Sequence, residues 1–305
     1  MLTEKPMKMK RGNYVQILGT GAGDYHLPAG LQPGYPMDGN TGKAWQRGGK
    51  DIRHSPAMFI SPNILVELGD GTAEQLTACG IPCERIRYLV VSHGHYDHFY
   101  PGKVLDFVDK LSSPLRIHGN GMIRDALDFA ATYRWDDANK EFVVHERRRN
   151  YRVKTVTLAK TFALGKVKVT PVLSSHFINR DYGILEQQAL NFVFERGGKT
   201  LFYNLDSNWL LPGTLEFLAK YRFDIAILDA TWCDLTVDIK NTGHHNFQML
   251  EKTLSQFRER GMLKDNAIVV YSHLSTATVP PHEETAARLA QQGITLAYDG
   301  LALEF

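Results

Sequence analysis

Six short apolar runs in this 305-residue chain each end within a few positions of an aspartate or a histidine. Runs of this length that are rich in β-branched residues predict strands. Helical patterns lie between several of them, and such alternation predicts an α/β fold with helices covering the sheets. Ligands of α/β sheets bind beyond the carboxyl ends of the strands, so the sequence predicts a site there. The runs and their polar residues are 63–68 with Asp70, 86–91 with His93, 167–173 with His176, 200–205 with Asp206, 224–228 with Asp229 and 267–272 with His273.

Between the strands, helical patterns cover residues 72–79, 102–111, 121–132, 212–221, 245–260 and 282–292. Two stretches lack this order. Residues 20–56 are rich in Gly and Pro and are expected to be a long loop, and 112–160 are expected to be an insertion or lid. The insertion carries the basic run Glu146–Lys154, which is either a solvated edge or a grip on an anionic substrate. The chain as a whole, 1–305, is expected to form a single domain.

Composition and charge exclude several classes of protein. The chain has 35 Lys and Arg against 33 Asp and Glu, a net charge of +2, so it lacks the electrostatic footprint of a general nucleic-acid or membrane-surface protein. Its three cysteines, Cys79, Cys83 and Cys233, imply no disulfide framework. The first residues lack the apolar core of a signal peptide, and no apolar run is long enough to cross a membrane. We therefore expect a cytoplasmic protein.

The densest group of potential metal ligands is the segment His93-Gly-His95-Tyr-Asp97-His98. His93 and His95 are two residues apart, so in extended backbone their rings point the same way and can hold one ion together. Asp97 and His98 follow where the chain turns towards the next helix, and they suit a second ion. Imidazole combined with carboxylate favours zinc, manganese or iron over magnesium or calcium. Tyr96, inside the motif, is expected to be a packing residue.

A catalytic zinc ion needs at least three protein ligands, so this segment does not supply enough for two ions. The strand ends offer the rest: His176 for the first ion, His273 for the second, and Asp206 as a bridge between them. Each ion then keeps an open position, which favours catalysis over a closed structural site. Alone, His176 and His273 would be ordinary strand-end histidines, and Asp206 a turn or helix-cap residue. Asp70 either orients a ligand histidine or forms an Asp-Gly turn.

This ligand pattern resembles that of the metallo-β-lactamase superfamily. The resemblance covers about residues 14–111 and 160–305. It implies a four-layer αββα sandwich with a dinuclear metal site on one edge. The segments LGTGAGD, DGTAEQL and AYDGLALEF look like the phosphodiesterase branch of the superfamily. Within that branch, the chain is similar to the tRNA 3′-processing endonucleases and to the phosphoribosyl cyclic-phosphate phosphodiesterases.

Both of these families carry an extra histidine between the bridging aspartate and the last ligand, and the segment TGHHNFQML matches that position. By resemblance, His245 is expected to contact the substrate phosphate or to protonate the leaving group. Which of His244 and His245 faces the site stays open, because one of them can instead cap the following helix. The cyclic-phosphate enzymes have a cysteine-rich loop for an extra structural zinc. Residues 20–56 contain no cysteine, so that zinc is not expected here.

We therefore expect a hydrolase with two divalent metal ions, Zn2+ or else Mn2+ or Fe2+, whose shared hydroxide attacks a small or cyclic phosphodiester. Asp97 and Asp206 are ligands in this scheme, and His245 assists departure of the leaving group. Three alternatives stay open: a lactonase or thioesterase on the same scaffold, a tRNA 3′-end endonuclease, and a non-catalytic binding protein, which the intact ligand set disfavours. A homodimer with 112–160 at the interface or over the site is also open.

Overall fold

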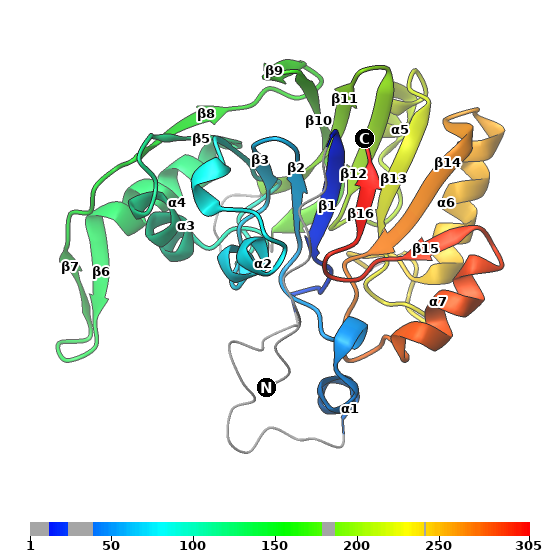
Figure 1. Ribbon diagram of the computed structural model, residues 1–305, viewed down its shortest axis with the longest axis horizontal. Helices are drawn as coiled ribbons and strands as arrows, with labels where there is room; N and C mark the ends of the chain where they lie inside the picture. Colours follow the sequence, from blue (N-terminus) through cyan, green and yellow to red (C-terminus); the bar gives the residue numbers. More distant parts are fainter. Residues whose placement is uncertain (1–11, 24–38, 179–186, 241) are drawn as a thin grey trace.

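The computed structural model describes residues 12–23, 39–178, 187–240 and 242–305. Two seven-stranded sheets face each other, with helices on their outer faces (Figure 1). The first sheet contains, in order across it, β16 (Ala302–Glu304), β1 (Tyr14–Gly19), β2 (Ala57–Ile60), β3 (Ile64–Val66), β4 (Tyr88–Val90), β5 (Leu115–Gly119) and β8 (Tyr151–Thr155). The second contains β15 (Ile294–Leu296), β14 (Leu263–Ser272), β13 (Phe223–Asp229), β12 (Lys199–Asn204), β11 (Gln187–Arg196), β10 (Val167–Ile178) and β9 (Phe162–Leu164).

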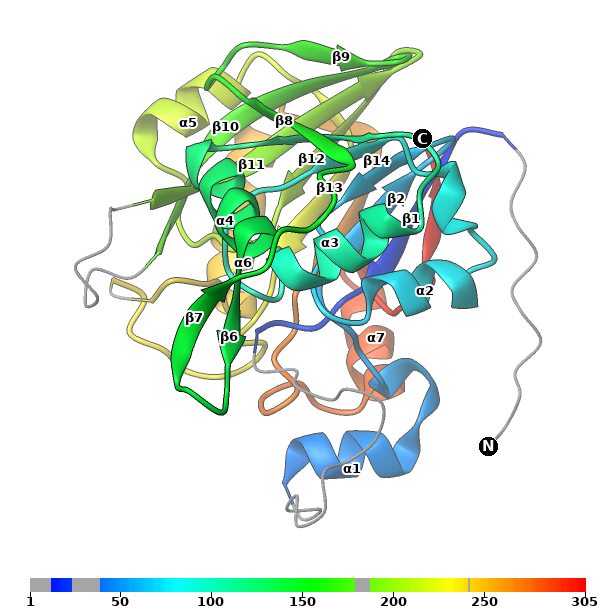
Figure 2. The ribbon, with the colours of Figure 1, turned by 90° about the vertical axis from the view of Figure 1, so that its left-hand side faces the viewer.

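Three apolar layers hold this sandwich together. One lies between the sheets and includes Val66 and Phe192. A second, which includes Leu89 and Phe107, lies between the first sheet and its helices, α2 (Thr72–Ala78), α3 (Pro101–Asp109) and α4 (Gly121–Thr132). Figure 2 shows these three helices in front of that sheet. The third, which includes Phe202, lies under α5 (Pro212–Leu218), α6 (Phe247–Glu259) and α7 (His282–Ala290). The four-layer αββα class predicted from the sequence is confirmed.

Helix boundaries follow local chemistry. Pro101 occupies the first turn of α3, where its missing N–H costs nothing. Helix α6 begins two residues later than predicted, because the side chain of Asn246 caps it by accepting a hydrogen bond from the Met249 N–H at 2.9 Å. Neither histidine before it is therefore the cap. Strands β11 and β12 form a hairpin, with Arg196 paired to Lys199 across the turn.

Most of the stretch 112–160, expected to be an insertion or lid, belongs to the first sheet and its helices. Strands β5 and β8 pair in parallel with each other, and β5 pairs with β4, so they extend the first sheet. Only the two-stranded sheet of β6 (Tyr133–Asp136) and β7 (Glu141–Val144) stands apart from the two large sheets (Figure 1). Strands β5 and β8 lack the continuous apolar runs of the predicted strands, because basic side chains lie between their apolar residues.

Residues 20–56, expected to be a long loop, contain the helix α1 (Asn40–Arg47), and 24–38 lie outside the described residues. Among the described residues, every helix is too short or too polar to cross a lipid bilayer. The three cysteines are free thiols, as the sequence suggested.

Candidate metal centre

The predicted ligands come from both sheets and meet at one edge of the sandwich. His93 to His98 follow β4 in the first sheet. In the second sheet, β12, β13 and β14 pair in parallel, so the residues after Asn204 and Ser272 emerge side by side. Asp206 and His273 therefore reach the same place. His176 lies within β10 rather than after a strand, because that strand is longer than predicted.

The first group of donors is His93, His95, His176 and Asp206, whose ligand atoms lie within 4.8 Å of one another. His95 Nδ1 is 2.9 Å from His93 Nε2 and 3.3 Å from His176 Nε2. Asp206 Oδ2 is 3.3 Å from His93 Nε2 and 3.4 Å from His176 Nε2. Three ring nitrogens and one carboxylate oxygen thus converge on one point.

The second group is Asp97, His98 and His273. The Nε2 atoms of the two histidines are 3.2 Å apart. Asp97 Oδ2 lies 3.4 Å from His98 Nε2 and 3.5 Å from His273 Nε2. The other oxygen of Asp206, Oδ1, lies 2.7 Å from His98 and 2.8 Å from His273. One carboxylate therefore faces both groups, as a bridging ligand would.

These donors fit divalent metal ions. Asp206 Oδ1 is buried and has no aligned hydrogen bond in the described part of the chain, despite two imidazole nitrogens within 2.8 Å. Buried carboxylate oxygens are normally satisfied, so an oxygen left without a donor among converging imidazoles indicates a missing cation. Three imidazoles with a carboxylate match the ligand preference of zinc and of the other divalent transition metals.

The backbone is held in an unusual conformation at two of these residues. Asp206 has φ 48° and His273 has φ 59°, both in the left-handed region that non-glycine residues rarely adopt. Such conformations each cost about 1–3 kcal/mol and cluster at functional sites, where the surrounding fold holds them. Here they turn both side chains back from their strand ends into the donor cluster.

Burial and charge set the protonation of these groups. Burial, together with the nearby His98, lowers the pKa of His93 to about 3, so this imidazole is the neutral form that binds metals. Burial also lowers the pKa of His98, but the carboxylates of Asp206 and Asp97 raise it more, and the pKa lies well above its usual value.

A buried carboxylate that the sequence did not single out supports His98. Glu67 Oε1 lies 3.5 Å from His98 Nδ1, and Glu67 Oε2 accepts a hydrogen bond from the Ser92 N–H at 3.2 Å. Asp70 was the candidate for this role. It instead pairs with Lys103 at 3.0 Å, at the surface. Glu67 reaches inward because its φ of 63° reverses the side chain that a regular strand would place elsewhere.

Two further residues, Asp229 and Thr231, contact His273 of the second donor group. Thr231 Oγ1 lies 2.8 Å from His273 Nδ1, and Asp229 Oδ2 lies 3.5 Å from the same nitrogen. Asp229 Oδ2 is also 2.8 Å from His244 Nδ1. Outer contacts of this kind fix the tautomer and orientation of metal-binding histidines.

The structure brings His244, not His245, to the cluster. The His244 ring centroid is 4.9 Å from that of His176 and 5.4 Å from that of His273. His245 points away: it packs edge-on against Trp209, its Nε2 is 3.3 Å from Thr253 Oγ1, and burial lowers its pKa to about 4. The expectation that His245 contacts the substrate is therefore corrected, because His244 and not His245 lies beside the donors.

Tyr96 does not pack as expected. Its side chain is 43% exposed, and its hydroxyl donates a hydrogen bond to the carbonyl of Gly23. This contact joins the ligand segment to the loop that follows β1. Tyr96 thus stabilises the position of these two segments relative to each other at the edge of the site.

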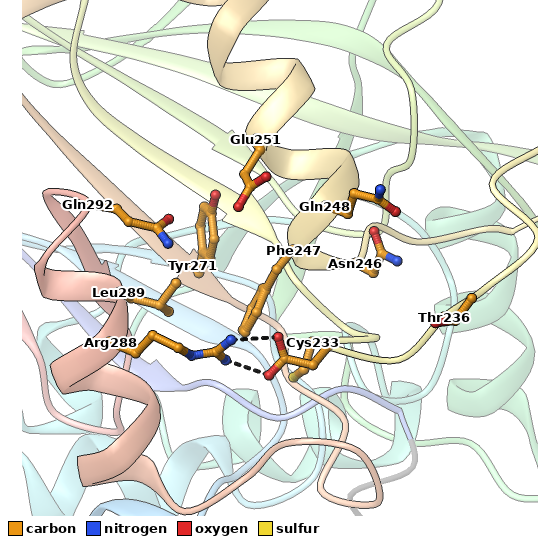
Figure 3. Close-up of a pocket in the computed structure, with 11 residues that line it drawn as sticks. Cys233, Thr236, Asn246, Phe247, Gln248, Glu251, Tyr271, Arg288, Leu289 and Gln292 are labelled. Carbon is orange, nitrogen blue, oxygen red and sulfur yellow. Dashed lines mark hydrogen bonds and ion pairs between the residues drawn. The ribbon is translucent and has the colours of Figure 1, made fainter.

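A separate cavity of ≈190 Å³ lies between α6, α7 and the end of β14 (Figure 3). An ion pair of Arg288 with Asp234 crosses it, and Tyr271 and Glu251 line it. Burial raises the pKa of Cys233, at its wall, to about 12, so this thiol stays protonated. None of the predicted site residues lines this cavity, which is distinct from the donor cluster.

Comparison with known proteins agrees with the geometry. The sequence profile of the beta-lactamase superfamily domain matches residues 63–273. Similar solved structures include a diphosphatase of the PhnP family, 21% identical over 96% of this chain and 98% of that one, with a TM-score of 0.66. Zn(2+)-bound PqqB from Methylobacterium extorquens is 18% identical over 96% and 100%, with a TM-score of 0.66. Human tRNase Z, short form, is 21% identical over 95% and 98%, with a TM-score of 0.60. No curated protein sequence matches the chain.

Proposed function

The chain belongs to the metallo-β-lactamase superfamily, and on that premise we propose that it is a metal-dependent phosphodiesterase acting on a small or cyclic phosphodiester. The observation that carries the proposal is the His244–Asp229 pair beside both donor groups. Two of the similar structures, a diphosphatase and tRNase Z, support a phosphoryl substrate. Their identity of 21% supports the fold and leaves the substrate to be tested.

In this proposal the two donor groups would hold two divalent ions, with Asp206 between them. Bound there, the ions would supply Lewis acidity and would lower the pKa of a water molecule towards neutrality. Zinc suits the donor set best, and manganese or iron would also suit it. The ligands of the first ion would be His93, His95 and His176. Those of the second would be Asp97, His98 and His273.

His244 is the proposed general acid. The Asp229 carboxylate accepts a hydrogen bond from His244 Nδ1, so the other ring nitrogen, Nε2, is the one available to substrate. The His244 side chain is 18% exposed, which leaves it open to the site. A proton from Nε2 would neutralise the alkoxide that leaves from phosphorus. A positive imidazolium would also stabilise the charge of a phosphodiester anion, which a neutral lactone lacks.

The experiment compares His244→Ala, His245→Ala and His145→Ala with the parent protein. His145 is exposed and far from the donors in sequence, so it controls for the loss of any imidazole. We expect His244→Ala to keep its metal by elemental analysis and to lose about 10²–10⁴-fold in kcat on bis-p-nitrophenyl phosphate. The control should retain the parent kcat. Parent-like turnover in His244→Ala would remove the assigned role.

A substrate panel tests the reaction class. It contains bis-p-nitrophenyl phosphate, a cyclic phosphodiester, a diphosphate ester, a lactone and a thioester, each assayed with the parent and with Asp206→Ala. We expect turnover of the phosphodiesters that is lost in Asp206→Ala. Faster turnover of the lactone or thioester would favour the carboxyl-ester alternative. Turnover confined to a pre-tRNA substrate, with a steep dependence on salt, would favour the endonuclease.

A further inference from the structure

The inner face of the first sheet changes from apolar to basic side chains at its free edge. In β3 and β4 the side chains that face the second sheet are apolar and join the layer between the sheets, as Val66 and Val90 do. The next two strands place Arg116 and His118 of β5, then Arg152 and Lys154 of β8, in register with that row. Residues paired directly across neighbouring strands lie on the same face, so these four side chains form a basic ladder on the inner face.

The second sheet does not extend over this ladder completely. Its edge strand β9 reaches His118, whose ring stacks on Phe162 at a centroid distance of 4.8 Å. Arg116, Arg152 and Lys154 remain exposed. Two hollows of ≈350 and ≈310 Å³ lie against them and share Tyr88, Arg116 and Arg152 in their walls. The ladder is therefore the floor of one open groove that begins where the second sheet ends.

The cations that line the groove, those of the ladder and Arg87, have no acidic partner among the described residues. Within the described ranges, no carboxylate forms an ion pair with Arg87, Arg116, Arg152 or Lys154. The neighbouring basic side chains behave differently: Arg147 pairs with Asp106 and Asp109, and Arg149 pairs with Asp128. Arg116 makes only a contact of 3.4 Å with the Tyr88 hydroxyl and lies over the Tyr88 ring. The basic run at 146–154 therefore divides into a paired part and an unpaired part.

The positive potential of the groove acts on His118, which is buried at its wall. Burial, together with the charges of Lys154 and Arg116, lowers the pKa of His118 to about 4. The ladder therefore holds this imidazole neutral. A second copy of the chain presenting the same face would add like charges, so the groove does not suit self-association through this surface.

From this arrangement we propose that the groove formed by Arg87, Tyr88, Arg116, Arg152 and Lys154 binds an organic polyphosphate of the nucleoside triphosphate class. Four unpaired cations match an anion of three or more charges. Guanidinium groups bind phosphate oxygens in a bidentate manner, and they outnumber the single lysine here. Each hollow is of the size of a small-molecule site. Tyr88 lines both hollows and adds an aromatic wall that suits a planar base.

This site is distinct from the metal centre. The ladder lies along β5 and β8 and begins at Tyr88, the first residue of β4, whereas the metal donors follow the opposite, carboxyl end of β4. The inference therefore does not depend on the proposed phosphodiesterase activity. Loss of binding at the groove and loss of turnover at the metal centre can be measured separately.

The test is a calorimetric titration with adenylyl imidodiphosphate, an ATP analogue that resists hydrolysis, and with inorganic tripolyphosphate. The variant is the double substitution Arg116→Gln and Arg152→Gln, and the matched control is Arg148→Gln and Lys252→Gln, which removes the same charge from exposed positions elsewhere. We expect saturable binding of both probes to the parent and the control, and at least a tenfold weaker Kd in the ladder variant. Turnover of bis-p-nitrophenyl phosphate should be the same in all three proteins.

Two results would overturn the proposal. One is an equal Kd in the ladder variant and the control, which would place the bound nucleotide elsewhere. The other is tighter binding of a single-stranded RNA 20-mer than of the nucleotide, lost in the same ladder variant, which would make the groove a nucleic-acid surface. Circular dichroism of each variant checks that the exposed substitutions leave the fold intact.

Discussion

His244 Nδ1 lies 2.8 Å from Asp229 Oδ2, and the same carboxylate oxygen is 3.5 Å from His273 Nδ1. Asp229 is buried at the end of β13 and binds the proposed acid on one side and a proposed metal ligand on the other. Burial raises the pKa of Asp229, but the charge and hydrogen bond of His244 together with the charge of His273 lower it more, so it stays an acceptor. One side chain thus links proton transfer to the second donor group.

Replacing this carboxylate should damage turnover more than metal binding. In Asp229→Asn the amide can donate as well as accept, so the His244 tautomer is no longer fixed. We expect kcat on bis-p-nitrophenyl phosphate to fall by about 10²-fold or more. Metal content should stay near that of the parent, because all seven proposed donors are intact. The matched control is Asp234→Asn, whose ion pair with Arg288 lies at the separate cavity.

Glu67 should control metal affinity. Removing its contact with His98 in Glu67→Gln frees the ring of a proposed ligand, and changes of this kind typically cost 10–100-fold in affinity (order of magnitude). Competition with a chromophoric chelator measures the effect on the dissociation constant. Asp70→Asn, which breaks only a surface pair with Lys103, should leave the constant unchanged. An equal loss in both variants would contradict the assignment of Glu67.

Gly69 should tolerate no side chain. A Cβ built there would lie 1.9 Å from the carbonyl oxygen of Asp97. Gly69→Ala must therefore displace the segment that carries Asp97 and His98. We expect bound metal to fall from two equivalents towards one, together with a lower Tm. Gly121→Ala, at a position with open space around the built Cβ, should change neither quantity.

Stability should depend on pH through His118. Its folded pKa of about 4 lies below the unfolded value of 6.5, so the unfolded chain takes up the proton first as pH falls. Stability is therefore lost progressively between pH 6.5 and about 4, by at most about 3 kcal/mol. In His118→Phe this contribution disappears, and the decrease in Tm from pH 7 to 5 should be smaller than in the parent. Histidines at the metal centre titrate in both proteins and cancel in the comparison.

Metal removal should destabilise the whole fold. Ions that bind only the folded chain add stability in proportion to the logarithm of their concentration over the dissociation constant. Added EDTA should lower the Tm measured by differential scanning calorimetry, and added Zn2+ should restore it. Asp206→Ala, which lacks the bridging carboxylate, should show little of this response. An unchanged Tm in the parent after verified metal removal would contradict a tightly bound centre.

Much of the donor cluster could be predicted because its members follow strands, and parallel strands end together. The sequence could not separate His244 from His245, since adjacent side chains point in different directions and only the packing of Trp209 and Thr253 decides which one is buried. The sequence analysis named Asp70 and not Glu67 as the residue that orients a ligand histidine. A strand pattern gives no sign that Glu67, at the strand end, has a left-handed backbone.

The sequence analysis did not predict strands β5 and β8, and the reason is related. Strand prediction depends on apolar residues recurring at alternate positions. In β5 and β8 apolar residues do alternate, but Arg116 and Arg152 lie between them, since the second sheet does not cover that face. The continuous apolar run of a strand buried on both faces is therefore absent. The feature that concealed the two strands in the sequence is thus the one that forms the basic groove.

The donor cluster joins distant parts of the chain: His98 and His273, 3.2 Å apart in space, are separated by 175 positions in sequence. Long segments must close before their side chains can meet, and such closure is slow. The centre is therefore completed late in folding, and each proposed ion would then cross-link the two sheets. Two fragments divided at the β11–β12 turn would each hold only part of the donors. Metal uptake on mixing them would report reassembly of the sandwich.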